Sequence, residues 1–258
     1  METEHVQRLE QQIRQSPLPR HVGVIMDGNG RWAEQRGLTR VQGHREGSAS
    51  VQEVTRCARR LGIQALTLYA FSTQNWSRPT EEIAALMELL VEYLEKEREE
   101  ILHNSIRLNL IGEIDRLPRW VREPMMRVRD ESAKNSGMVL TLALSYGGRD
   151  EIVRAARMLA ERSARGELTP SRIDERSFES CLWTAELPPL DLVIRTSGEQ
   201  RISNFMLWQA AYAELVFIDT LWPDVRAEQF LRCVETFQHR ERRFGLTGAQ
   251  VRATAARR

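Results

Sequence analysis

The chain has little cysteine, and its few thiols suit neither a disulfide framework nor a metal site. Cys57, Cys181 and Cys233 lie far apart in 258 residues. An odd number of widely spaced thiols indicates a reducing compartment. The five histidines are also scattered, and neither H-E-x-x-H nor C-x-x-C occurs. The sequence therefore excludes a zinc site of the common kinds.

Long apolar runs and an excess of one charge are missing as well. No window approaches the ~18 apolar residues of a membrane span, and the first sixteen residues lack the apolar core of a signal peptide. The 37 basic and 36 acidic side chains leave a net charge of +1, so no overall field would gather nucleic acid. We expect a cytoplasmic protein with no nucleic-acid partner, in which any anion site is a local cluster.

Short apolar runs alternate with helical patterns along the chain. Continuous Val, Ile and Leu runs are typical of parallel strands that are covered on both faces. The alternation predicts an α/β fold: a single domain with a central, mostly parallel six-stranded sheet flanked by helices. Strands are expected at 22–27, 65–71, 107–111, 139–145, 190–196 and 215–220, and helices at 43–61, 81–103, 118–135, 149–165 and 226–240.

The first predicted strand ends at Asp27 and is followed at once by a glycine-rich loop, 28–33 (GNGRWA). Glycines there let backbone N–H groups approach an anion at a helix N-terminus. Read literally, the loop also matches G-x-G-x-x-A, the dinucleotide-binding pattern of a Rossmann oxidoreductase. However, Asp27 would repel a pyrophosphate unless a cation lay between them. The second predicted strand also ends in 71–76 (FSTQNW), without the acid that holds ribose hydroxyls. The loop therefore favours phosphate binding that involves a cation.

Arginines and small polar residues follow three of the predicted strands. Ligands of open α/β sheets bind beyond the carboxyl ends of the strands, so we expect these side chains to converge. A guanidinium group can bind two phosphate oxygens at once. Several arginines at one site therefore imply more than one phosphate group. A magnesium ion usually takes one or two carboxylates and completes its shell with phosphates and water. The residues are Arg31, Arg40 and His44 after the first strand, Ser72, Asn75, Trp76 and Arg78 after the second, and Arg195, Arg201 and Ser203 after the fifth.

With these motifs in order, the sequence resembles the cis-prenyltransferase family, in its bacterial undecaprenyl diphosphate synthase form, over nearly its whole length. The matching segments are 21–33 (HVGVIMDGNGRWA), 43–44 (GH), 66–79 (LTLYAFSTQNWSRP), 146–149 (YGGR), 195–205 (RTSGEQRISNF), 207–209 (LWQ), 212–215 (YAEL) and 240–245 (RERRFG). Two departures are small: Ser145 stands where the family often has asparagine, and Ser197 where it often has glycine. We expect both to alter hydrogen bonding near the cleft while activity is retained.

The resemblance implies an enzyme that condenses isopentenyl diphosphate units onto an allylic diphosphate, expected to be farnesyl diphosphate, with the help of Mg²⁺. The product would be a long-chain cis-polyprenyl diphosphate, the undecaprenyl lipid carrier of cell-wall synthesis. It also implies a homodimer and transient contact with the inner face of the membrane for product release. The catalytic domain would span 19–245, between an N-terminal polar helix or flexible segment, 1–18, and a basic flexible tail, 246–258.

Two alternatives share this fold: a short-chain cis-prenyl diphosphate synthase, and a non-catalytic partner subunit. A partner subunit would be expected to lose Asp27 or the segment 195–203, and both are present. A trans-prenyltransferase would need a D-D-x-x-D motif, which the chain lacks.

Individual roles also follow from the resemblance. Asp27 would hold magnesium as the essential carboxylate. Glu214 matches a second magnesium position, yet it stands where a strand begins, the wrong edge for a parallel strand. It would then act through an antiparallel strand or from a dimer partner. The allylic diphosphate would be held by Gly28, Asn29, Gly30, Arg31, Trp32, Arg40 and His44. The cleft would be lined by Ser72, Thr73, Gln74, Trp76 and Arg78. Isopentenyl diphosphate would be clamped by Arg195, Arg201 and Ser203, and Ile202 would be a further substrate-binding residue.

The family assigns proton acceptance to the position of Asn75. Because a neutral amide is a poor base, we expect Asn75 to orient the substrate or to relay the proton to a phosphate oxygen, with Asp27 or His44 as competitors. A growing isoprenoid also implies an apolar tunnel between sheet and helices. Apolar residues recur at helical spacing over 83–94 and could form one wall, although the pattern alone indicates an ordinary core helix.

Overall fold

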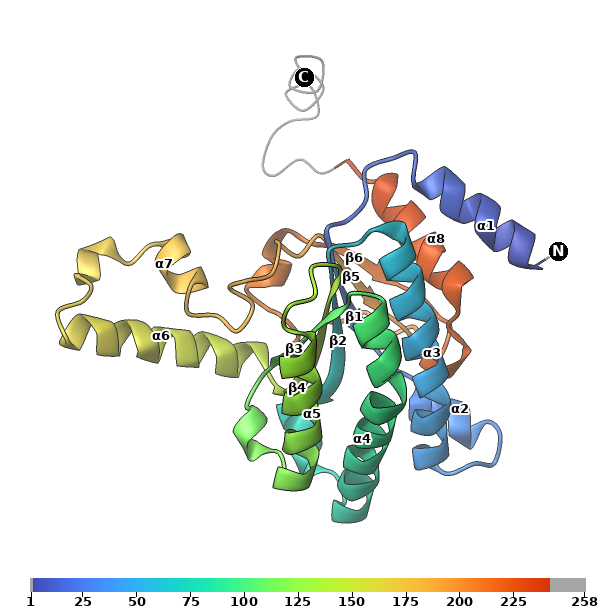
Figure 1. Ribbon diagram of the computed structural model, residues 1–258, viewed down its shortest axis with the longest axis horizontal. Coiled ribbons are helices and arrows are strands. Elements are labelled where there is room, and N and C mark those ends of the chain that lie inside the picture. Colours follow the sequence, from blue (N-terminus) through green and yellow to red (C-terminus); the bar gives the residue numbers. More distant parts are fainter. Residues whose placement is uncertain (1, 242–258) are drawn as a thin grey trace.

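The structure is a computed structural model that describes residues 2–241, so the expected tail 246–258 lies outside the described residues. Its centre is a sheet of six strands in the order β3-β4-β2-β1-β5-β6 (Figure 1). Every neighbouring pair is parallel, which confirms the predicted α/β sheet. The strands are β1 (His21–Ile25), β2 (Ala65–Ser72), β3 (Arg107–Ile111), β4 (Val139–Tyr146), β5 (Leu192–Arg195) and β6 (Glu214–Phe217).

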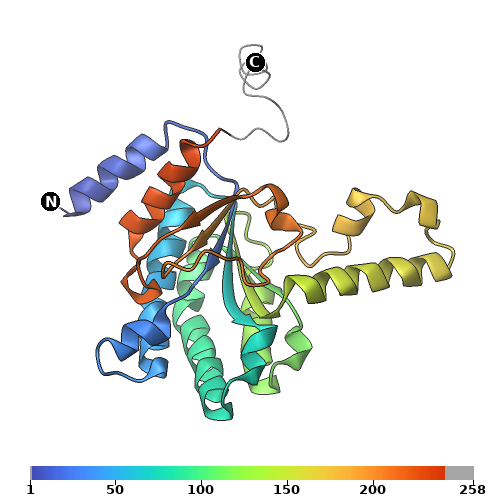
Figure 2. The ribbon, with the colours of Figure 1, turned by 180° about the vertical axis from the view of Figure 1, so that it is seen from behind.

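One face of the sheet is covered by helices α3 (Arg40–Leu61), α4 (Thr80–His103), α5 (Arg119–Ser132) and α8 (Ala227–Gln238) (Figure 1). The other face, seen in Figure 2, is crossed mainly by the segment that joins β5 to β6. Helices α6 (Gly148–Ala164) and α7 (Glu175–Glu179) project from the body as an arm. The N-terminal helix α1 (Glu2–Ile13) packs on α8.

Local signals explain where the helix that matters most for the site begins and ends. Thr39 and Gln42 form a reciprocal capping box at the start of α3, and Gly62 ends the helix with a φ of 86°. The predicted helix 43–61 therefore begins three residues early. A short helix, α2 (Asn29–Glu34), was not expected, because its six residues are too few to show a helical period.

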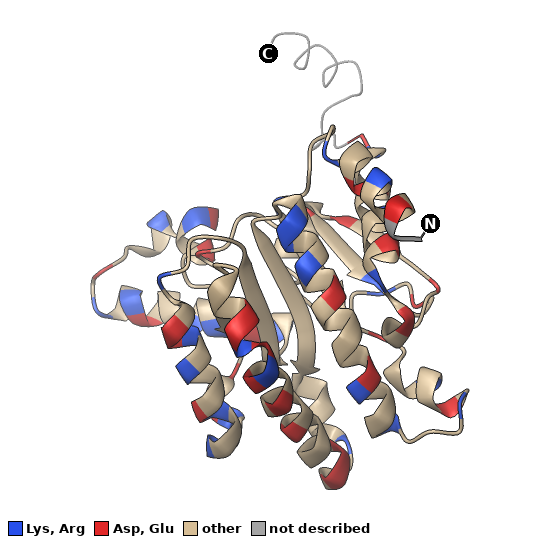
Figure 3. Cartoon of the chain, turned by 45° about the vertical axis from the view of Figure 1, so that its right-hand side comes forward, with Lys and Arg blue, Asp and Glu red and all other residues tan. Residues whose placement is uncertain are grey.

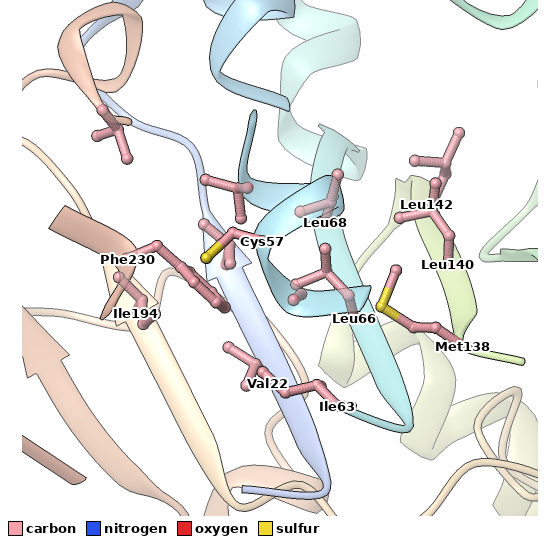
Figure 4. Close-up of a cluster of buried hydrophobic side chains, with 14 of the residues drawn as sticks. Val22, Cys57, Ile63, Leu66, Leu68, Met138, Leu140, Leu142, Ile194 and Phe230 are labelled. Atoms are coloured by element: carbon pink, nitrogen blue, oxygen red, sulfur yellow. The ribbon is translucent and has the colours of Figure 1, made fainter. Parts of the chain in front are cut away.

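The hydrophobic core lies between the sheet and the helical layer. Successive strand residues point to opposite faces, so Val22 of β1 and Leu66 of β2 meet Cys57 of α3 and Phe230 of α8 (Figure 4). All three cysteines are buried and free. Burial raises the pKa of the Cys57 thiol to about 12, so it is a packing residue and not a reactive thiol.

Helix α1 is bound to the body by its apolar face. Leu9 and Ile13 are buried, with 3% and 2% of their surface exposed. Within residues 2–241, no helix combines the length and apolar character needed to cross a membrane. Both acidic and basic residues occur along the helices in Figure 3, in keeping with a net charge of +1.

Candidate active site

The carboxyl ends of β1, β2 and β5 border an open cleft of about 500 Å³. The parallel sheet brings these ends to one edge, which is where ligands of open α/β sheets bind. Seven of the predicted site residues line this cleft, although they come from segments more than 170 positions apart. The cleft is lined by Ile25, Met26, Asp27, Tyr69, Ser72, Gln74, Asn75, Arg78, Arg195, Ser203 and Asn204.

An ion pair between Asp27 and Arg195 lies at the bottom of the cleft. The Arg195 side chain is only 4% exposed, and its Nη2 donates to Asp27 Oδ2 at 2.8 Å. The other carboxylate oxygen accepts from the Gly28 backbone N–H at 2.7 Å. Asp27 itself is 32% exposed, so its remaining lone pairs face the cleft. The site thus offers one solvent-accessible carboxylate that is held in place by a buried cation.

The ionisation of Asp27 follows from these contacts. Burial by itself raises the pKa of Asp27, but the hydrogen bond and positive charge of Arg195, the Gly28 N–H and the charge of Arg31 outweigh it. The pKa of Asp27 therefore lies below its ordinary value. A carboxylate in this state is charged at neutral pH and can bind a cation.

Arg195 also fixes the segment that follows β5. Its Nη1 donates to Ser203 Oγ at 2.7 Å and to the carbonyl of Arg201. The Arg201 guanidinium turns away and pairs with Glu199. Ile202 packs into a small apolar cluster on the second face of the sheet. Of the three residues expected to clamp isopentenyl diphosphate, Arg195 and Ser203 line the cleft and Arg201 does not. Ile202, expected as a further substrate-binding residue, does not line it either.

The glycine-rich loop leads directly into α2. Gly28 has a φ of 103°, a conformation that favours glycine, and α2 begins at the next residue. Arg31 reaches back over the cleft edge, donates to the Ser197 carbonyl at 3.1 Å, and lies 3.7 Å from Asp27. Trp32 instead donates its indole N–H to Asp224 at 2.7 Å. Trp32 is therefore a structural contact of α2 here.

Helices α2 and α3 approach each other at Gly43. A Cβ atom built on Gly43 would lie 2.1 Å from the backbone oxygen of Asn29. The close approach of the helices also brings Arg40 beside the loop. A Cβ atom built on Gly30 would lie 3.1 Å from the guanidinium carbon of Arg40. Arg40 also lies 3.7 Å from Glu82 of α4, so it is held between the loop and α4.

The turn after β2 is a short 3₁₀ helix, Thr73–Ser77, that carries Asn75 and Trp76. The side-chain oxygen of Asn75 accepts from the Ser72 backbone N–H at 3.0 Å. Its amide N–H₂ group is thereby left as the polar group that can face the cleft. Thr73 donates to Asp150 at 3.1 Å, and Arg78 donates to Glu82 at 3.0 Å.

The two departures from the family pattern have a physical consequence. Ser145 has a φ of 46° and Ser197 a φ of 75°, in the left-handed region that asparagine and glycine tolerate best. Each serine hydroxyl has a partner, because Ser145 Oγ accepts from Trp76 Nε1 at 2.9 Å and Ser197 Oγ accepts from Arg31. At both positions a strained backbone conformation is therefore accompanied by a hydrogen bond from a predicted site residue, Trp76 or Arg31.

His44 stands between the cleft and an apolar pocket. Burial, followed by the nearby charges of Arg78 and Arg40, lowers the pKa of His44 to about 4, so its ring is neutral at pH 7. The pocket has a volume of about 110 Å³, lies between the sheet, α3 and α4, and shares Met26 with the cleft. It is lined by Met26, His44, Ser48, Val51, Leu68, Ala70, Phe71, Leu86, Met87, Leu89, Leu90, Tyr93 and Leu142.

Glu214 lies at the opposite edge of the sheet. Val22 of β1 and Glu214 of β6 both pair in register with Leu192 of β5. Asp27 is five residues beyond Val22, so a rise of ~3.3 Å per residue and two strand spacings of ~4.8 Å separate Asp27 and Glu214 by roughly 19 Å. Because β6 is parallel, the antiparallel explanation for Glu214 is wrong. Within one chain the two carboxylates cannot share an ion, and Glu214 pairs with Arg240 at 3.0 Å.

Three cleft residues were not expected from the sequence. The buried Thr196 hydroxyl accepts from the Asp27 N–H at 2.9 Å and donates to the Asp27 carbonyl at 2.6 Å. Tyr69 and Asn204 line the cleft directly. Thr196 and Asn204 are sequence neighbours of the predicted clamp residues Arg195 and Ser203, and this proximity could have identified them as site residues. Tyr69 gave none, because an aromatic residue inside a strand is most often core.

Comparisons with known proteins identify the family of this chain. The model of a family described as "Putative undecaprenyl diphosphate synthase" matches residues 25–245. An isoprenyl transferase from Chlorobaculum tepidum is 48% identical over 95% of this chain and 93% of its own. A ditrans,polycis-undecaprenyl-diphosphate synthase ((2E,6E)-farnesyl-diphosphate specific) from Shewanella oneidensis is 47% identical over 94% of this chain and 88% of its own.

Two solved structures have the same fold. Lavandulyl diphosphate synthase from Lavandula x intermedia, in complex with dimethylallyl diphosphate, aligns with a TM-score of 0.87 at 37% identity and covers 88% of this chain and 98% of its own. A probable undecaprenyl diphosphate synthase from Campylobacter jejuni aligns with a TM-score of 0.73 at 35% identity and covers 89% and 99%.

Proposed function

Because the chain belongs to the undecaprenyl diphosphate synthase family, we propose that it is a cis-prenyltransferase that adds isopentenyl diphosphate units to farnesyl diphosphate. The observation that carries the proposal is the cleft in which Asp27, Arg195 and Ser203 meet beside an apolar pocket. Such a site can hold diphosphate groups at its polar end and a hydrocarbon at its apolar end. The product would be the undecaprenyl carrier of cell-wall synthesis.

A magnesium ion fits the residues present. Within residues 2–241, no group of three or more acidic, histidine or cysteine side chains can hold a metal alone. One accessible carboxylate beside arginines is instead the setting in which Mg²⁺ takes most of its ligands from substrate phosphates and water. Asp27 would hold the ion, which when bound would neutralise charge on the diphosphate that leaves.

The chain's own groups support the reaction in distinct ways. The loop N–H groups at the start of α2, together with Arg31 and Arg40, would bind the leaving diphosphate, and Arg195 with Ser203 would bind the second diphosphate. These fixed positive groups would stabilise the charge that develops when the allylic bond breaks. The isopentenyl double bond would attack the allylic cation to form a new carbon–carbon bond, and the resulting cation would lose a proton from the neighbouring carbon to leave the new double bond. The N–H₂ group of Asn75 would orient the phosphate oxygen that accepts the proton, because the Asn75 oxygen already accepts from Ser72.

The hydrocarbon would extend into the pocket between α3 and α4. A pocket of about 110 Å³ is small beside a long polyprenyl chain, so a long product would need these helices to part into a tunnel. The lavandulyl diphosphate synthase fold at a TM-score of 0.87 keeps a short-chain product as the second candidate. Product length separates the two.

We further propose a homodimer that works in the cytoplasm, with transient contact to the inner face of the membrane for product release. Glu214 then has a role only if a second copy brings it near Asp27, since roughly 19 Å separate the two in one chain. A Glu214→Gln variant that lowers activity without lowering stability would support that role. Unchanged activity would remove it.

The proposed activity is tested by incubating the purified protein with farnesyl diphosphate, radiolabelled isopentenyl diphosphate and Mg²⁺, with and without chelator. We expect a magnesium-dependent ladder of polyprenyl diphosphates. Asp27→Asn keeps the shape of the side chain and removes its charge, and should lower kcat by about 10³-fold, as loss of one central electrostatic group does. No incorporation by folded wild-type protein would favour the partner-subunit alternative and overturn the proposal.

A further inference from the structure

Three non-glycine residues in the segment that carries Ser203 have left-handed backbone conformations. Ser203, Asn204 and Met206 have φ values of 44°, 63° and 44°. Each such residue is strained by ~1–2 kcal/mol, and strain persists only where surrounding contacts impose it. The contacts that impose this loop conformation therefore also set the position of Ser203 against Arg195.

The first such contact is the N-terminus of α6. Gly147, the residue before the helix, provides no side-chain cap. Asn204 caps the helix from 55 positions away: its carbonyl accepts from the Gly148 N–H at 2.7 Å, and its side-chain oxygen accepts from the Arg149 N–H at 2.9 Å. Helix N-terminal N–H groups need such acceptors, so the two bonds tie the loop to α6.

The second contact is aromatic. The Phe205 ring is fully buried and stacks on Tyr69 with 4.7 Å between ring centroids. The Tyr69 hydroxyl lies between two carbonyl acceptors, that of Tyr146 at 3.2 Å and that of Ser203 at 3.4 Å. Tyr69 thus holds the loop from β2 while Asn204 holds it from α6. The Asn204 side chain joins the loop to a helix terminus and also lines the cleft.

We propose that Asn204 is a positioning residue that fixes Ser203 and Arg195 in the geometry required to bind the second diphosphate. The step from Asn204 to substrate is short: Ser203 is its neighbour, and Ser203 Oγ accepts from Arg195 Nη1 at 2.7 Å. Asn204 tolerates a φ of 63° better than most residues do and supplies the acceptor for Arg149. This role rests on the proposed function, in which Arg195 and Ser203 bind isopentenyl diphosphate.

The test compares Asn204→Ala and Asn204→Asp by steady-state kinetics in which each substrate is varied in turn. Asn204→Ala removes the acceptor, and the KM for isopentenyl diphosphate should rise by roughly fivefold, since a lost cap is worth ~1 kcal/mol and ~1.4 kcal/mol is tenfold. The KM for farnesyl diphosphate should change less than about twofold. Asn204→Asp keeps an acceptor at a helix N-terminus, where a carboxylate is favoured, so its Tm should match that of the wild type, while its charge in the cleft should repel the diphosphate and keep the KM for isopentenyl diphosphate raised.

A matched control is Asn135→Ala. The Asn135 side chain also bonds to the backbone, with Nδ2 donating to the Ile106 carbonyl at 2.7 Å, but it does not line the cleft. This variant should lower Tm and leave both KM values unchanged. If Asn204→Ala lowered only Tm, or raised both KM values equally, the positioning role would be overturned. Absence of product from the wild type would instead overturn the proposed function, so the two failures are distinct.

Discussion

The contact between α2 and α3 leads to a prediction that opposes the usual effect of glycine substitution. In a helix, Gly→Ala normally stabilises by ~1 kcal/mol. A Cβ on Gly43 would lie 2.1 Å from the Asn29 oxygen, and ordinary contact begins at 3.4 Å, so α2 and α3 must separate by about 1.3 Å. Such overpacking costs ~1–3 kcal/mol, so Gly43→Ala should give a net loss of up to about 2 kcal/mol.

The larger effect should be on activity. Asn29 belongs to the loop at the start of α2, so a displaced α2 moves the N–H groups and Arg31 relative to Asp27. A misplacement of about 1 Å can lower the rate by ~10²-fold, and we expect a fall of that size in kcat/KM for Gly43→Ala. Urea denaturation would measure the free energy of unfolding, and initial rates of isopentenyl diphosphate incorporation would measure kcat/KM.

Gly37→Ala is the matched control. Gly37 has a φ of 66° and no atom within 4 Å of a Cβ built on it, so the substitution strains the backbone without a clash. It should lose ~1 kcal/mol of stability and keep full activity. A Gly43→Ala protein that is more stable than wild type and equally active would refute the reasoning.

Three further predictions follow from single contacts. Folded-state pKa values of about 4 for His21 and His44 mean that the unfolded chain binds more protons below the ordinary value of 6.5. The free energy of unfolding should therefore be greatest above pH 6.5 and fall by up to about 3 kcal/mol per histidine as the pH drops to 4. A free energy of unfolding, measured by urea denaturation, that did not change between pH 6.5 and pH 4 would contradict this. Ser197→Gly should relieve a φ of 75° and raise stability by ~1 kcal/mol, yet weaken the hold on Arg31 and raise the KM for the allylic substrate; a less stable variant would count against strain at Ser197. Leu90→Trp, in the apolar pocket, should shorten the product, whereas Glu88→Trp on the exposed side of α4 should not; equal product lengths would remove the pocket from chain growth.

The sequence predicted the sheet, the long helices and the site edge because these follow from local pattern. Continuous apolar runs identify parallel strands, and parallel strands place Asp27 and Arg195 at the same edge. What the sequence did not predict depends on contacts between distant segments. The capping of α6 by Asn204 joins positions 55 apart, and no periodicity records it. The turn of Arg201 toward Glu199 and of Trp32 toward Asp224 likewise depends on partners that pattern does not identify.

The short helix α2 was missed for a related reason. Its six residues are fixed by contact with α3 at Gly43, and isolated helices of that length are unstable on propensity alone. For Glu214 the sequence suggested a contact that one chain does not make. Motif similarity assigned Glu214 to the same site as Asp27, but the parallel direction of β6 separates the two residues within one chain.

The stereochemistry of the added units is the most direct test of the central claim. Purified protein would be given farnesyl diphosphate, ¹³C-labelled isopentenyl diphosphate and Mg²⁺, and the new double bonds would be assigned by NMR after the chain length is found by mass spectrometry. The account predicts that every added unit is cis and that the chain reaches undecaprenyl length. New trans double bonds, or a labelled substrate returned unchanged by folded protein, would contradict it.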